Sequence, residues 1–158
     1  MATILKSSPA GIETITVDDE EWAAQNQQPL DVLYDSKHQS INAERDRRLY
    51  PGPLPTSIAT VDLRSARDES NLAHLRAVAR ERQTANDITP IHFRNADNVT
   101  QMLAPAQVIT MTDEVLGYGQ QIYATSWKLK DQLQAIYDDE QLTPAEKRTQ
   151  LEAVVWPE

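Results

Sequence analysis

A long helical pattern in the last third of the chain constrains the fold more than any other feature. From Ala104 to Tyr137 the sequence carries helix-forming residues, and the pattern weakens for only one turn, at Thr125 and Ser126. The apolar residues that recur at threes and fours are Val108, Met111, Val115, Tyr118, Ile122, Leu129, Leu133 and Ile136. A helix of this span is ~50 Å long. It therefore extends beyond any shorter helix packed against it.

Two glycines, Gly117 and Gly119, lie inside this pattern. Each weakens a helix by roughly 1 kcal/mol relative to alanine. Either they permit the close approach of another backbone, or the helix bends or breaks there. Because this Gly-x-Gly does not stand between a strand and a helix, we interpret it as a packing feature and not as a phosphate-binding loop.

A β-hairpin is predicted directly before the long helix, in the sequence PIHFRNADNVTQMLAPAQV. Ile91 and Phe93 alternate as one face of a strand, and Val99 and Leu103 as one face of the returning strand. The segment NADN between them is typical of a turn, because Asn and Asp bond their own backbone and tolerate positive φ. Pro105 then suits the first turn of the helix, where a missing N–H has no partner to lose.

A second amphipathic helix is predicted at about residues 68–85, where Leu72, Leu75 and Ala79 recur at helical spacing. The strand-like segment TSIATVDL precedes it. The stripe of the long helix could form a coiled-coil seam, but we favour an antiparallel pair with this second helix, reversed by the hairpin. The remaining apolar length near Ile122, Trp127 and Leu133 then needs the C-terminal helix or another subunit.

The N-terminal third is less regular. Residues 2–17 are predicted to be extended, a short helix is expected at about residues 20–28, and LDVLY at 30–34 is interpreted as a strand. A helix is expected at about residues 37–49, with Asp35 or Ser36 as its cap. It stops at YPGPLP, through which we expect neither helix nor sheet to run, because of its three prolines and one glycine.

The last element is a capped helix at residues 143–154. Thr143 is placed as the N-cap, Pro144 as N1 and Glu146 as N3, which is a capping box with proline. We therefore predict a mainly helical α+β fold. It contains an N-terminal extended docking segment with short helices (1–50), a helical pair with its hairpin (56–137) and a C-terminal capping helix (143–154).

The composition narrows the function classes. The 158 residues carry a net charge of -9, which disfavours binding to a phosphate backbone, and no cysteine is present for disulfides or thiolate metal sites. No apolar stretch approaches the ~20 residues that span a bilayer, and we see no secretory signal. We expect partners that are neither nucleic acid nor membrane.

No sequence motif indicates catalysis. The chain has no G-x-S-x-G, no glycine-rich phosphate loop, no H-E-x-x-H, and no histidine at a recognised metal spacing. We therefore expect no enzyme, no cofactor and no metal site, although a pair of carboxylates brought together by the fold would escape this reading. The basic cluster ERDRR at 44–48 is interrupted by two acids, so we expect a solvated helix face with internal ion pairs.

Four segments in order resemble a known family: INAERDRRL, TVDLRSARDESNLAHLRAVA, TPIHFRNADNVTQMLAPAQVI and YATSWKLKDQL. They resemble a domain of unknown function common in tail and tail-fibre-associated proteins of tailed bacteriophages, over about residues 41–136. Ala104 departs from that family's pattern, because a threonine often precedes PAQ there, and its side-chain cap is lost.

The resemblance implies structural or interaction roles for particular residues. Arg94, Asp97 and Asn98 match the family's hairpin motif, and Asp97 and Asn98 would hold its turn. Trp127 matches the W-x-L-K motif and would fill the gap between the long helix and the hairpin, where we also expect Phe93 to supply the largest apolar contact.

The function that the resemblance implies is structural. We expect a non-enzymatic component of a tailed-phage virion, made in the cytoplasm of the bacterial host and present in the tail in several copies. It would be a minor tail, baseplate or fibre-attachment protein that binds other tail or fibre proteins and forms a homo-oligomer. The alternative is a tail-fibre assembly chaperone that does not remain in the particle, and an enzyme is a distant third.

Overall fold

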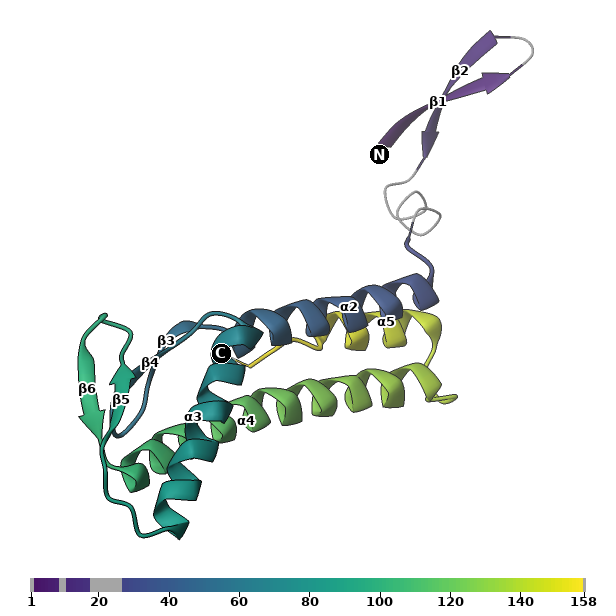
Figure 1. Ribbon diagram of the computed structural model, residues 1–158. Helices are drawn as coiled ribbons and strands as arrows, with labels where there is room; N and C mark the ends of the chain where they lie inside the picture. Colours follow the sequence, from purple (N-terminus) through teal and green to yellow (C-terminus); the bar gives the residue numbers. More distant parts are fainter. Residues whose placement is uncertain (1, 9–10, 18–26, 158) are drawn as a thin grey trace.

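The computed structural model describes residues 2–8, 11–17 and 27–157 and shows a mainly helical α+β fold, as predicted (Figure 1). A long helix, α4 (Pro105–Asp138), forms its spine. The elements along the chain are β1 (Ala2–Ser8), β2 (Gly11–Val17), α2 (Leu30–Leu49), β3 (Gly52–Pro55), β4 (Thr60–Leu63), α3 (Ala66–Thr84), β5 (Ile91–Arg94), β6 (Thr100–Leu103), α4 and α5 (Pro144–Ala153). The strands form three separate two-stranded antiparallel sheets.

Helix α4 runs for 34 residues without interruption. Pro105 starts it, and the Ala104 N–H donates to Gln107 Oε1 at 2.9 Å, which is the half of a capping box that does not need an N-cap side chain. The helix is not broken at Gly117 or Gly119, and a Cβ at either position would meet nothing within 4 Å. Neither the break nor the close backbone approach that we expected is therefore present among the described residues.

The first core lies around the N-terminal half of α4, which packs against α3 with the β5–β6 hairpin joining them, as predicted. Ser65 caps α3 by accepting a hydrogen bond from the Asp68 N–H, so this helix begins two residues earlier than expected. Both Ala79 of α3 and Val108 of α4 are fully buried, which lets the two helices approach closely. The buried members of this core are Ala59, Val61, Leu63, Leu72, Ala79, Ile91, Phe93, Leu103, Val108, Met111 and Val115.

The proline-rich segment contributes a strand, which corrects our expectation that no sheet could run through it. Strand β3 contains Pro53 and Pro55 and pairs with β4, with Gly52 opposite Leu63 and Pro55 opposite Thr60. A two-stranded sheet has free edges, so a proline without an N–H can be accommodated there. The tip of the neighbouring hairpin is attached to this sheet, because the Ala96 N–H donates to the Thr60 carbonyl at 2.9 Å.

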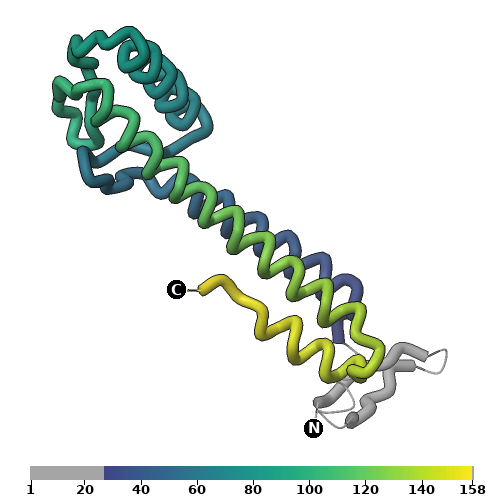
Figure 2. Tube along the Cα trace, turned by 90° about the horizontal axis from the view of Figure 1, so that it is seen from below, coloured from purple at the N-terminus to yellow at the C-terminus, as the bar shows by residue number. Residues whose placement is uncertain are grey.

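The second core is built from helices and the residue that follows α5, and it lies around the C-terminal half of α4. Figure 2 shows α2 and α5 running alongside this half, at the opposite end of α4 from α3. The buried residues of this core are Leu33, Ile41, Leu129, Leu133, Ile136, Leu151 and Val154. The stretch of α4 from Leu129 to Ile136 is thus covered within the chain, by the C-terminal helix as anticipated and also by α2, whereas Trp127 stays exposed.

Helix α2 differs from the sequence prediction. It begins at Leu30 with Pro29 at the N-cap, so the expected strand at 30–34 and the expected cap at Asp35 or Ser36 are wrong. Leu33 is buried against the second core, and this tertiary contact stabilises a helix that the local pattern does not indicate. Although α2 falls within the proposed 1–50 segment, it shares its core with α4 and α5.

At the ends of the chain, two expectations agree with the structure. The predicted extended segment is present as β1 and β2, paired with Ala2 opposite Val17. Helix α5 begins at Pro144 with the capping box intact: the Thr143 N–H donates to Glu146 Oε2 at 2.8 Å, and the Glu146 N–H donates to Thr143 Oγ1 at 3.3 Å. The short helix expected at about 20–28 lies almost wholly outside the described residues.

None of the described helices is both long enough and apolar enough to cross a membrane.

Candidate interaction site

The hairpin tip is ordered by Asn95, which the prediction did not emphasise. The Asn95 N–H donates to the Val99 carbonyl at 3.0 Å, and Asn95 Oδ1 accepts from the Val99 N–H at 2.9 Å. Asn98 has φ of 65° and donates its N–H to the Asn95 carbonyl at 2.9 Å, and its side chain accepts a hydrogen bond from Arg94. Within residues 27–157, Asp97 makes no side-chain hydrogen bond. The turn is therefore held by Asn95 and Asn98 rather than by Asp97.

The hairpin strands present one buried face and one exposed face. Ile91 and Phe93 are buried while His92 is exposed, as the alternation predicts. On the returning strand Leu103 is buried, but Val99 precedes the strand and is 54% exposed, so the expected Val99–Leu103 face is wrong. Phe93 thus belongs to the first core and is not available for an external partner.

The three predicted residues of α4 have different environments. Leu133 is fully buried in the second core, Ile122 is partly buried, and Trp127 is 60% exposed. Trp127 does not fill the gap beside the hairpin, because it lies 23 residues beyond Ala104, ~34 Å along the helix axis. It also points away from the core, since the neighbouring positions Ser126 and Leu129 are the buried ones.

Instead, Trp127 lies beside Tyr123, with 6.0 Å between ring centroids. Tyr123 is 40% exposed, and about two turns further toward the N-terminus of α4 Leu116 is 42% exposed. These residues lie on one side of α4 at a spacing of seven and four, so they form a single stripe. We call Leu116, Tyr123 and Trp127 the exposed stripe.

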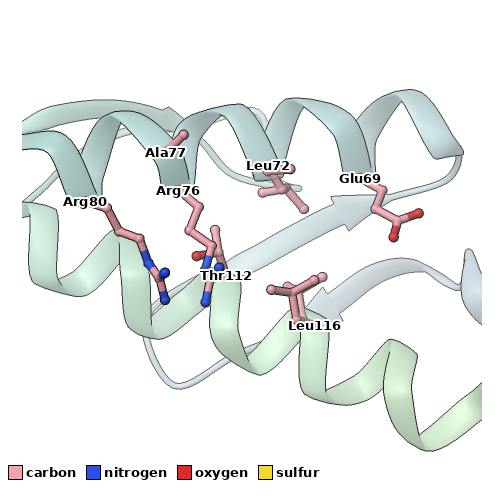
Figure 3. Close-up of a pocket in the computed structure, with 9 residues that line it drawn as sticks. Glu69, Leu72, Arg76, Ala77, Arg80, Thr112 and Leu116 are labelled. Atoms are coloured by element: carbon pink, nitrogen blue, oxygen red, sulfur yellow. The ribbon is translucent and has the colours of Figure 1, made fainter.

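The stripe borders a hollow of about 410 Å³ between α3 and α4 (Figure 3). Leu72, Thr112 and Leu116 supply apolar surface, while Arg76 and Arg80 reach from α3 toward α4. A second, smaller hollow of about 130 Å³ adjoins it, because both are lined by Glu69, Val115 and Leu116. Gly119 and Tyr123 line this second hollow, so the open surface follows α4 toward its middle.

Ion pairs and charge-assisted bonds surround this surface. Both Arg76 hydrogen bonds go to Oδ1 of Asp113, which ties α3 to α4 at the edge of the larger hollow. The hydroxyl and the N–H of Ser57 hold the pKa of Glu114 below its ordinary value, because both donate to its carboxylate. The Arg45 guanidinium lies 5.7 Å from the centre of the Tyr123 ring.

The basic cluster on α2 is paired internally, as expected. Glu44 accepts hydrogen bonds from Arg47 at 2.6 and 2.7 Å and from Arg48 at 2.7 Å, and Arg45 pairs with Asp46 at 2.6 Å. The bonds from Arg47 and Arg48 lower the pKa of Glu44 to about 2. These guanidinium groups are thus paired with carboxylates of the same helix.

The side chains of this surface are of mixed chemical character. It combines apolar side chains, aromatic rings and guanidinium groups, a composition enriched in protein–protein interfaces. In the part of the chain that the structure describes, no group of three or more His, Asp or Glu side chains could hold a metal ion.

The family of the chain follows from residues 33–150, which match DUF4376, a domain of unknown function. The chain belongs to the DUF4376 family. No curated protein and no solved structure matches it.

The DUF4376 match begins within α2 and ends within α5. The first core, the whole of α4 and the second core apart from Leu151 and Val154 therefore belong to the family domain, whereas the resemblance recognised in the sequence covered only residues 41–136. The two aromatic rings of the exposed stripe lie within the DUF4376 domain. All the residues that line the two hollows lie within it as well.

The exposed stripe of the DUF4376 domain was missed as a unit by sequence reasoning. A signal for it exists, because Leu116, Tyr123 and Trp127 are out of phase with the buried series that contains Val115, Leu129 and other core residues. A second apolar series on one helix indicates a second contact surface.

Proposed function

We propose that this DUF4376 protein is a non-enzymatic structural component of a tailed-phage virion that acts through protein–protein contacts. It would serve as a minor tail, baseplate or fibre-attachment protein, made in the cytoplasm of the bacterial host and assembled into the tail. The observation that carries the binding role is the exposed stripe of Leu116, Tyr123 and Trp127 on a long helix fixed at both ends.

The physical support is the cost of leaving this surface in water. A tryptophan that is 60% exposed beside a tyrosine that is 40% exposed presents large apolar rings to solvent. Burying such rings against a partner is favourable at ~25 cal/mol per Å², and aromatic residues dominate binding energy in interfaces. The stripe needs little ordering on binding, because α4 is already fixed by two cores.

The phage context is supported by the resemblance of the ordered motifs within residues 41–136 to tail-associated proteins. The net charge of -9 favours protein partners over nucleic acid or an anionic membrane surface, since both carry negative charge. Several copies in one particle also suit a surface whose individual contacts are small, because multivalency raises the effective affinity.

The test is peptide mapping of purified phage particles that encode this chain, with quantification against a major tail protein. Stoichiometric recovery of its peptides from intact particles is the expected result. Peptides found in the infected-cell lysate but absent from particles would overturn the virion assignment and favour the tail-fibre assembly chaperone.

A matched pair of variants then tests the binding role. Trp127→Ala should abolish incorporation into particles or reduce it strongly, whereas Gln132→Ala, an exposed substitution on the same helix, should leave incorporation unchanged. Equal incorporation of both variants would contradict the role of the exposed stripe.

A further inference from the structure

One side of α4 between Asp113 and Asp131 is left open by the described elements. Its exposed positions include Asp113, Gln120 and Gln121, Ala124 and Lys128, with Leu116 and Trp127 along one border. At 100° per residue, the set from Asp113 to Lys128 lies within an arc of about 100°. We call this surface the open face of α4.

The open face has nearly the same character when it is read in either direction. Gly117 and Ala124, both small, lie at equal distances from the midpoint between Gln120 and Gln121. Asp113 and Lys128, with opposite charges, also lie at equal distances from this midpoint. Reversing one helix against an identical helix therefore brings small residues opposite small residues and opposite charges together.

We propose that two copies of this chain associate through their open faces, with the two α4 helices antiparallel about a two-fold axis between Gln120 and Gln121. The proposal refines the homo-oligomer that the sequence resemblance implies, and it rests on the proposed function only in assigning a binding role to α4. An isologous contact requires such a self-complementary surface.

Charge complementarity supports a second copy of the chain as the occupant. Lys128 of one copy comes opposite Asp113 of the partner subunit, and in residues 27–157 Lys128 has no ion-pair partner of its own. The two Arg76 hydrogen bonds to Asp113 both use Oδ1, so Oδ2 remains to accept from a lysine. A parallel arrangement would lose this pairing, because it would place Asp113 opposite Asp113 and Lys128 opposite Lys128.

The glycine at the centre of the face supports close approach. A Cβ at Gly117 would meet nothing within 4 Å in the single chain, so the fold itself does not require a glycine there. Opposite Ala124 of the partner subunit, a residue without a side chain allows two helix backbones to come close. Leu116 then comes within two residues, ~3 Å along the axis, of the level of Trp127 of the partner subunit, so the exposed stripe is covered at the border of the face.

The size of the face sets the expected affinity. The face is ~27 Å long and one helix, ~10 Å, wide, which is smaller than the ~800 Å² per partner of a standard interface. The dimer of the isolated protein should therefore be weak, with a Kd above ~1 μM. Sedimentation equilibrium up to millimolar protein should show a reversible transition between monomer and dimer.

Two glycine variants form a matched test of this dimer. Gly117→Gln places a side chain in the centre of the open face and should raise the dimer Kd by at least ~10-fold. Gly119→Gln is the control, because Gly119 faces the smaller hollow beside the open face, and its Kd should stay within about twofold of the parent. Since a Cβ has room at both positions, neither variant should lower the melting temperature.

Cysteine cross-linking tests the orientation. The chain contains no cysteine, so a single introduced thiol can pair only with its copy. Gln120→Cys should form a disulfide-linked dimer on mild oxidation, because both copies lie next to the axis. Asp131→Cys should not, because the two copies would be ~32 Å apart in the antiparallel pair, whereas in a parallel pair they would be adjacent.

The outcomes separate this proposal from the proposed function. A parent protein that stays monomeric up to millimolar concentration, a dimer unaffected by Gly117→Gln, or efficient cross-linking of Asp131→Cys would each overturn the antiparallel dimer. Stoichiometric recovery from particles together with a monomer in solution would leave the virion role standing while this proposal fails. If the protein forms the dimer in solution but is absent from particles, the antiparallel dimer stands and the virion role fails.

Discussion

The two ends of α4 pack against different kinds of secondary structure. At its N-terminal end, α4 packs with one helix and with small two-stranded sheets, all of them contributed by residues 52–103 immediately before it. At its C-terminal end it packs with α2 and α5, which lie on either side of it in the sequence, and with no strand from residues 27–157. The first core closes over short sequence distances, whereas the second must bring residues more than 100 positions apart together.

The contacts that close the second core show how this is achieved. Lys37 of α2 donates to the Glu152 carbonyl at 2.7 Å and to the Val154 carbonyl at 3.1 Å, and so satisfies free carbonyls at the end of α5. The Trp156 indole N–H donates to the Ile41 carbonyl at 3.3 Å, and the Arg48 guanidinium lies 5.1 Å from the Trp156 ring centre. The comparison teaches that one helix can take part in two cores at once, one formed by residues that are near in sequence and one formed by residues that are far apart.

The largest expected effect is that of Phe93→Ala in the first core. Phe93 is 8% exposed and is the only phenylalanine of the chain, so its truncation should lower the free energy of unfolding by about 4 kcal/mol. Urea denaturation measures this value, with exposed His92→Ala on the same strand as control. A loss below about 1 kcal/mol would contradict a core role for the hairpin.

Leu133→Ala is the corresponding change in the second core. Leu133 is fully buried, and we expect a loss of about 3 kcal/mol because a cavity is left between α2, α4 and α5. Exposed Gln132→Ala serves as the control.

Hydrogen exchange on these two variants sharpens the comparison of the two ends. If the cores open independently, Phe93→Ala should accelerate exchange in α3 and β5–β6, and Leu133→Ala should accelerate it in α2 and α5. Equal acceleration at both ends in both variants would show that the two cores unfold as one unit.

Thr143→Ala should have a smaller effect, about 1 kcal/mol, because it removes the cap of α5 but no core contact. The measurement is the change in melting temperature, and Thr143→Ser, which keeps the hydroxyl, should behave like the parent. A melting temperature unchanged by the alanine would mean that the docking of α5 does not depend on its cap.

The smallest effect is expected from the surface pairs of α2. Because Arg47 and Arg48 lower the pKa of Glu44 from 4.5 to about 2, the carboxylate stabilises the fold above pH 4.5, and this contribution is lost as the pH falls toward 2. The parent should therefore lose a slight stability advantage over Glu44→Gln across this range. Thermal unfolding at several pH values tests it, and a constant difference between the two proteins would contradict the assignment.

The sequence predicts elements that carry local signals better than elements that depend on distant contacts. The alternation at Ile91 and Phe93, the NADN turn and the capping box at Thr143 are local signals, and the elements they predict are present. Helix α2 buries only Leu33 and Ile41, eight residues apart, so its stabilising contacts leave no local periodicity to read.

The candidate site was predicted only in part, for a similar reason. The sequence shows which residues of α4 are apolar, but it does not show which face of the helix other elements cover. Leu133 and Trp127 therefore appeared equivalent, although Leu133 is buried and Trp127 is 60% exposed. The strand at Pro53 and Pro55 depends on a free sheet edge, which is likewise a property of the assembled fold.

The unbroken course of α4 has a mechanical consequence. Because both cores contain residues of α4, rotating one end of the molecule about the axis of this helix exerts a torque on the other end. The strain would gather in the middle turns, where Gly117 and Gly119 give the backbone its least steric restraint. The molecule should thus behave as a short torsion bar whose compliance is set by two residues that carry no side chain.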